Sequence, residues 1–157
     1  MIRDGKPFAV AQTNADEREG QFSPDGRWMA YVSNETAGID EVYVRPFPDP
    51  GGKWQVSMNG GVDPRWGHDG RELFYVAPDG KLMTVAIDPD GRALNPRPPV
   101  PLFTTRLATG PNITIGFLST PQYAVALDGR FLMNVTVDDN VVSPISIVLN
   151  WATALKK

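Results

Sequence analysis

The chain has 157 residues, of which 41% are apolar and 21% charged, with 15 Gly and 15 Pro. This composition predicts one β-rich domain that is long enough to bury a core. The formal charge of −3 argues against nucleic-acid binding through phosphate neutralisation. The absence of Cys excludes disulfides and thiolate chemistry, and it leaves the compartment open. No segment has the apolar length of a signal peptide or a membrane span, so we expect no membrane insertion.

The first predicted element is a strand over residues 7–12, which precedes any repeated unit. A hairpin follows at Asp25-Gly26, because Gly adopts a positive φ without penalty and Asp hydrogen-bonds nearby backbone amides. Two further strands are predicted over 41–45 and 53–57, on either side of a loop rich in Pro and Gly. Residues 19–57 are therefore predicted to form one four-stranded unit.

The same pattern recurs at Asp69-Gly70, which again precedes an Arg and an apolar run. Strands over 81–87 and 100–104 complete a second predicted unit over 62–105. The segment that follows, 106–120, is unusually apolar for a loop. We interpret it either as a loop or extra hairpin folded over the sheets, or as a contact for a partner or ligand. Its candidate contact residues are Ile113, Ile115, Phe117 and Leu118.

A third copy of the pattern is centred on Asp128-Gly129. It leads to a predicted strand over 145–151, after which no fourth strand is predicted. Residues 121–151 are therefore interpreted as a partial third unit, and 152–157 as a tail. The turn Asp residues of the three copies lie 44 and 59 residues apart, and a period of about 40–45 residues is typical of four-stranded propeller blades.

The predicted fold class is all-β, with about three blades of four antiparallel strands and twelve strands in total. Strands 28–32 and 73–76 are apolar on both faces, as expected where sheets pack face to face. No window has helical periodicity. Three blades do not close a ring, since propellers have about four to eight. Either the chain belongs to a longer propeller, or two copies form a six-bladed ring as a strand-swapped homodimer, in which 7–12 of each copy completes the 145–151 blade of the other.

No residue pattern predicts a catalytic, metal-binding or cofactor-binding site. The only histidine, His68, occupies a turn position and is interpreted as a turn residue. The Gly-x-Ser-x-Gly nucleophile motif and the kinase motifs are absent. Residues 88–91 and 138–140 are interpreted as solvated turns, because neither matches a calcium loop. We assign a structural role to the turn residues Asp25, Gly26, Asp69, Gly70, Asp128 and Gly129. We assign packing between blades to Trp28, Trp54, Trp66 and Trp151.

Residues 22–32 (FSPDGRWMAYV) resemble the TolB-type, WD-like β-propeller repeat, and residues 66–75 and 125–132 resemble it with substitutions. The segments 41–48, 52–57 and 148–157 are similar to the C-terminal blades of bacterial propellers that are often fused to serine/threonine kinase domains. The resemblance implies a non-catalytic propeller that binds proteins, and it is compatible with a periplasmic location. It leaves two alternatives: the substrate-gating propeller of a prolyl-peptidase-like hydrolase, and a half-propeller that self-assembles into a ring and binds a small ligand in its central channel.

Overall fold

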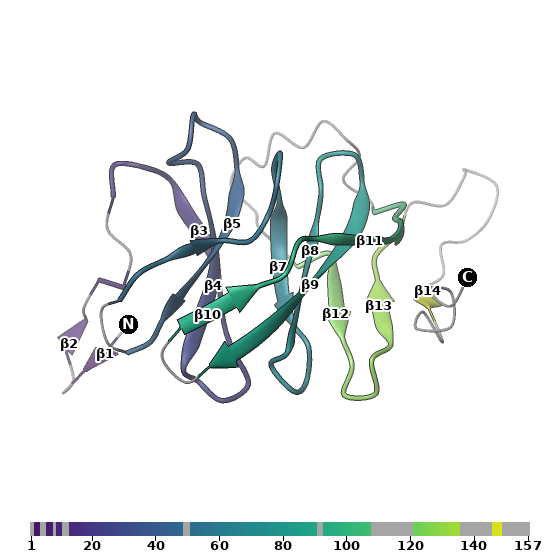
Figure 1. Ribbon diagram of the computed structural model, residues 1–157. Coiled ribbons are helices and arrows are strands. Elements are labelled where there is room, and N and C mark those ends of the chain that lie inside the picture. Colours follow the sequence, from purple (N-terminus) through teal and green to yellow (C-terminus); the bar gives the residue numbers. More distant parts are fainter. Residues whose placement is uncertain are drawn as a thin grey trace.

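The computed structural model describes residues 2–3, 6–7, 9–10, 13–48, 51–90, 93–107, 121–135 and 146–148. Within these residues the chain forms fourteen strands in four antiparallel sheets and no helix (Figure 1). The all-β prediction is confirmed. Three of the sheets stack face to face along the molecule, and we call them the first, second and third sheets in chain order.

The first sheet is a four-stranded meander, with each strand paired to the next in sequence. Its strands are β3 (Glu17–Phe22), β4 (Trp28–Ser33), β5 (Glu41–Pro46) and β6 (Trp54–Gln55). The last of them is shorter than the predicted strand over 53–57. Every residue of β4 is buried, because this strand lies inside the sheet and has protein on both faces, as its continuous apolar run predicts.

The second sheet has five strands and is organised around one long strand, β9 (Lys81–Asp90). The first half of β9 pairs with β11 and the second half with β10. The other strands are β7 (Val62–Trp66), β8 (Glu72–Val76), β10 (Ala93–Pro96) and β11 (Val100–Thr104). The turn predicted over 88–91 is therefore wrong for Asp88, Pro89 and Asp90, because pairing with β10 keeps these residues extended.

The third sheet has three strands within the described residues: β12 (Tyr123–Val125), β13 (Phe131–Met133) and β14 (Ser146–Val148). The strand predicted over 145–151 is described only where it forms β14. The hairpin turns that open the three sheets point toward the same lower edge of the molecule in Figure 1.

The N-terminal residues form a small hairpin of their own, in which β1 (Ile2–Arg3) pairs with β2 (Lys6–Pro7). This corrects the prediction of a single strand over 7–12, since Pro7 ends β2 and Ala9 and Val10 lie outside any strand. The side chain of Val10 instead packs against buried residues of β4 and β5. The described residues contain two strands more than the predicted twelve, because the hairpin has two strands where one was predicted and β10 was not predicted.

Two apolar layers hold the three sheets together. Between the first and second sheets, alternate residues of β4 meet Leu73, Tyr75, Val85 and Ile87 of the second sheet. Between the second and third sheets, Phe74 and Val76 meet Tyr123, Phe131 and Met133. Since odd and even positions of β8 belong to different layers, this strand joins both. Burial of these two layers is the main source of stability that the structure shows.

Candidate functional site

The three hairpin turns share one hydrogen-bond pattern. In each, the Asp Oδ1 accepts the backbone N–H of the Arg two residues later, at 3.0 Å for Asp25, 2.9 Å for Asp69 and 3.2 Å for Asp128. The following glycines Gly26, Gly70 and Gly129 have φ of 70°, 72° and 80°, a backbone region that favours Gly. Burial would raise the pKa of Asp25, but hydrogen bonds from Ser23 and Arg27 outweigh it and lower the pKa to about 2.

The third turn is one residue shorter than the first two. The first closes where the Ser23 N–H donates to the Trp28 carbonyl, and the second where the Gly67 N–H donates to the Glu72 carbonyl. The third closes earlier, from the Ala126 N–H to the Arg130 carbonyl. Because side chains alternate between the faces of a strand, a shift of one residue exchanges the two faces of the strand that follows.

This shift decides which side chains of β13 face the second sheet. Phe131 and Met133 point into the layer against Phe74, whereas Leu132 points outward and is 46% exposed. Leu132 lies two residues after Arg130, where the third turn closes. In the first sheet, the residue two positions after the closure at Trp28 is Ala30, which is fully buried against the second sheet. Leu132 thus occupies a position that in the earlier sheets packs against the next sheet.

We call the outward side of the third sheet the open face. Leu132 lies at its centre and is paired in register with Ala124 of β12, which is also exposed. Asn134, two residues after Leu132, is exposed as well. The open face thus places an exposed Leu beside an exposed Ala, next to the polar Asn134, whose Nδ2 donates to Gln122 Oε1 at 3.3 Å.

The opposite end of the stack is closed within the same chain. Met29, Tyr31 and Tyr43 form a buried cluster on the outer side of the first sheet, with Val10 packed against it. The rings of Tyr31 and Tyr43 are stacked, with centroids 5.8 Å apart. Burial, followed by the charge of Glu35, raises the pKa of Tyr31 to about 12, so this hydroxyl stays protonated at neutral pH.

A second candidate site lies where the first strands of the three sheets meet. Glu19 of β3 and Asp63 of β7 are 44 residues apart, and each lies at a break in strand register with a positive φ, 58° and 54°. The Asp63 N–H donates to Glu19 Oε2 at 2.7 Å. From the third sheet, the Tyr123 hydroxyl donates to the Asp63 carbonyl oxygen at 2.8 Å. A chain of hydrogen bonds therefore crosses all three sheets.

The charges around Asp63 are unbalanced. Burial, followed by the negative charge of Glu19, raises the pKa of Asp63 to about 6, although Arg65, with its Nη2 3.5 Å from the Asp63 Oδ1, partly opposes the shift. The same burial raises the pKa of Tyr123 well above its usual range. Sequence reasoning missed this cluster. The signal that could have found it is the 44-residue interval between two acidic residues, which equals the interval between the turn residues Asp25 and Asp69.

The tryptophans of the first two sheets take part in packing. Trp28 is buried and makes an edge-to-face contact with Trp54, with centroids 5.7 Å apart. Trp66 of the second sheet donates its Nε1–H to the Gln21 carbonyl oxygen of the first sheet at 3.2 Å. Trp151 lies outside the described residues.

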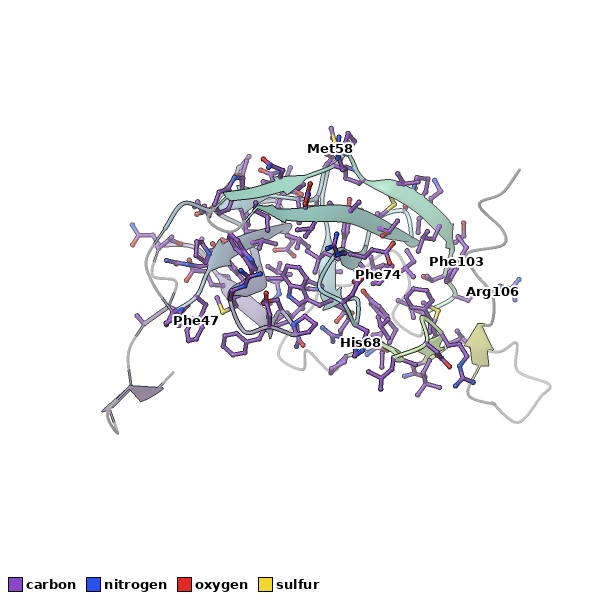
Figure 2. All side chains as sticks on the ribbon, turned by 60° about the horizontal axis from the view of Figure 1, so that its bottom comes forward. Phe47, Met58, His68, Phe74, Phe103 and Arg106 are labelled. Carbon is purple, nitrogen blue, oxygen red and sulfur yellow. The ribbon has the colours of Figure 1, made fainter. Side chains whose placement is uncertain are left out.

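His68 lies in the exposed turn between β7 and β8 (Figure 2). We expect the substitution His68→Ala to change the free energy of unfolding by less than about 0.5 kcal/mol, because an exposed turn side chain loses few contacts. Urea unfolding of both proteins measures the difference. A loss above about 1 kcal/mol would show that this side chain has a structural contact and is more than a turn residue.

The candidate contact residues Ile113, Ile115, Phe117 and Leu118 lie outside the described residues, as does the acidic segment 138–140. The segment that contains the four candidates begins next to the second apolar layer, since Leu107 is buried and forms a bridge with Val135. Figure 2 shows Phe74 and Phe103 on the side of the second sheet that faces this layer.

Within the described part of the chain, no group of three or more His, Asp and Glu side chains is arranged to hold a metal ion. No helix long and apolar enough to cross a membrane occurs among these residues either.

The stacking of antiparallel meander sheets, with their first strands adjacent, defines a segment of β-propeller type. No protein-family model matches the sequence, and no curated protein matches it. Among solved structures, the chain is similar to the crystal structure of TolB from Acinetobacter baumannii, with a TM-score of 0.48 and 14% sequence identity. The match covers 90% of this chain and 43% of that chain, so this chain spans less than half the length of that structure.

Proposed function

We propose that the chain is a non-catalytic β-propeller module that binds another protein through the open face of its third sheet. The observation that carries the proposal is the outward position of Leu132, where the equivalent residue of the first sheet is buried against the next sheet. A side chain of this kind gains free energy when a partner sheet covers it. The partner is therefore expected to present an apolar sheet face.

The non-catalytic part of the proposal is supported by the residues that the chain offers. It has one histidine and no cysteine, and the histidine lies in an exposed turn. Among the buried carboxyl groups, Glu41 accepts hydrogen bonds from the Ser57 hydroxyl and the Gly60 N–H. Asp63 contacts Arg65 and, through its backbone carbonyl, Tyr123 of the third sheet. These contacts place the buried carboxyl groups within and between the sheets.

We further propose that a second copy of this chain supplies the partner sheet. The open face of one copy would then pack against the first sheet of the other copy, in the way that neighbouring sheets pack within one chain. Two stacks of three sheets would complete a six-bladed ring. The outer side of the first sheet would receive it, which requires Val10 to leave the Met29, Tyr31 and Tyr43 cluster. Since Ala9 and Val10 are not in a strand, the proposed dimer is one of packed faces and does not depend on strand exchange.

The oligomeric state tests this proposal directly. We expect light scattering after size-exclusion chromatography to give twice the chain mass of 17.2 kDa, and the substitution Leu132→Glu to give the monomer, because a carboxylate on the open face opposes burial. The control is Leu127→Glu, since Leu127 belongs to the same sheet region but lies in the turn and is 78% exposed. This control should remain dimeric.

Two results would contradict the proposal. Wild-type protein that is monomeric at every concentration would exclude the second copy as the partner. An equal effect of Leu132→Glu and Leu127→Glu would show that added charge, and not the open face, changes the association.

A further inference from the structure

The cluster between the first strands of the sheets is rich in carboxylates. Arg18 contacts three carboxylates: Asp16 at 3.2 Å, Glu19 at 3.6 Å and Asp40 through a close ion pair. Arg65, at 3.5 Å, is the positive group beside Asp63. These contacts join four carboxylates and two guanidinium groups.

Burial makes a negative charge costly at Asp63 in particular. The side chains of Glu19 and Asp63 are 5% and 12% exposed, and a buried charge without a full counter-charge destabilises the folded state. Glu19 is held near Asp63 by the hydrogen bond from the Asp63 N–H to its Oε2. The two carboxylates therefore stay close as long as the first and second sheets remain in contact here.

Both residues of this contact have an uncommon backbone conformation. Glu19 and Asp63 have positive φ, a conformation that non-Gly residues adopt only where the surrounding structure enforces it. The hydrogen bond from the Asp63 N–H to Glu19 Oε2 joins the two register breaks. The Tyr123 hydroxyl bond to the Asp63 carbonyl extends this contact to the third sheet.

We propose that Glu19 and Asp63 form a pH-sensitive clasp between the first and second sheets, which is tightest when Asp63 is protonated and loosens when Asp63 is ionised. The charged groups that face the Asp63 carboxyl are Glu19 from β3 and Arg65 from β7, and Tyr123 from β12 is the titratable group that faces its carbonyl. The strands β4 and β5 also pack against β7, but none of their described residues contributes to the raised pKa of Asp63.

The direction of the effect follows from where Asp63 titrates. Its pKa is raised from 3.8 to about 6 in the folded protein, so between these values the folded state binds a proton that the unfolded state has lost. Stability therefore rises as pH falls from about 7 to about 4, and the full penalty is present above pH 7. A shift of about two units corresponds to a change of up to about a hundredfold in the unfolding equilibrium constant.

The test is urea unfolding between pH 4.5 and 7.5 for the wild type and for Asp63→Asn. Asn keeps the size of the side chain and tolerates the positive φ, but it carries no charge. We expect the variant to be more stable than the wild type at pH 7.5, by about tenfold to a hundredfold in the unfolding constant, and the difference to shrink steadily as the pH falls toward 4.5. Subtracting the two profiles removes contributions from other groups such as Glu72, whose pKa burial also raises.

Two further variants separate charge from structure. Glu19→Gln keeps an acceptor for the Asp63 N–H and removes the nearby charge, so the titration of Asp63 should move to lower pH. Asp128→Asn is the control: this turn residue has a lowered pKa because of hydrogen bonds from Arg130, and the substitution should leave the pH profile between 4.5 and 7.5 parallel to that of the wild type.

The proposal is overturned if Asp63→Asn is less stable than the wild type at every pH, because Asp63 would then have only a structural role. It is also overturned if the two profiles run parallel. Should the variant fail to fold, the carbon chemical shift of the Asp63 carboxyl in wild-type protein decides the matter. A titration midpoint near 6 supports the clasp, and a midpoint near 4 excludes it.

Discussion

Replacing Phe131 by Ala is expected to lower the free energy of unfolding by about 3–5 kcal/mol, the cost of removing a large aromatic side chain from a packed core. Phe131 is 0% exposed. Its ring centroid lies 5.0 Å from that of Phe74, 6.0 Å from Phe103 and 6.3 Å from Tyr123. Because rings from both the second and the third sheet surround it, the cavity would remain where these sheets meet. Urea unfolding with a global fit of the slopes measures the loss.

The neighbouring residue provides the control for this prediction. Leu132 is on the same strand but points to the open face, so Leu132→Ala is expected to cost less than about 1 kcal/mol in the monomer. The contrast tests the shorter third turn as well as the core. If Leu132→Ala proved costly and Phe131→Ala mild, the two faces of β13 would be exchanged, and the open face would have to be redrawn around Phe131 and Met133.

The hairpins were predictable because their signal is local. An Asp-Gly pair between extended runs requires only its own turn geometry, and all three pairs lie in turns. The continuous apolar runs of β4 and β8 likewise predicted strands covered on both faces. The long β9 was not foreseen, because Asp88 to Asp90 have turn-forming sequence and stay extended through pairing with β10, which lies later in the chain.

The orientation of the third sheet could not be read from the same signal. All three copies have Asp-Gly-Arg, yet the third closes its turn one residue earlier. Matching the copies letter by letter places Leu132 opposite Leu73, which is buried against the first sheet. Packing decides between the two registers, since the observed one buries Phe131 against Phe74 and leaves Leu132 exposed. The candidate open face was therefore accessible only from the structure.

The cluster at Glu19 and Asp63 was missed for a different reason. Both residues adopt a positive φ at a register break, and this conformation is uncommon enough in non-Gly residues that the sequence did not point to it here. Their approach also depends on how two sheets pack. The N-terminal strand was misjudged in a related way, because an apolar segment near a repeat can either pair with a strand or cover a sheet face, and Val10 covers one.

Replacing Gly60 by Ala is expected to destabilise the protein by about 2–5 kcal/mol, because two costs combine. Gly60 has a φ of 106°, and a positive φ costs a residue with a Cβ roughly 1–2 kcal/mol. The added Cβ would also lie 2.5 Å from Pro78 Cγ, and overpacking costs about 1–3 kcal/mol. Neither strain is easily relieved, since the Gly60 N–H donates to Oε1 of the buried Glu41 at 3.0 Å.

The matched control for this substitution is Gly26→Ala. Gly26 has a φ of 70°, but nothing lies within 4 Å of the position its Cβ would take, so only the backbone cost of roughly 1–2 kcal/mol applies. Urea unfolding of the two variants separates the backbone cost from the cost of the contact. Equal losses would show that Pro78 moves aside freely. The loop between β6 and β7, which connects the first sheet to the second, would then be less tightly packed than the position of Gly60 indicates.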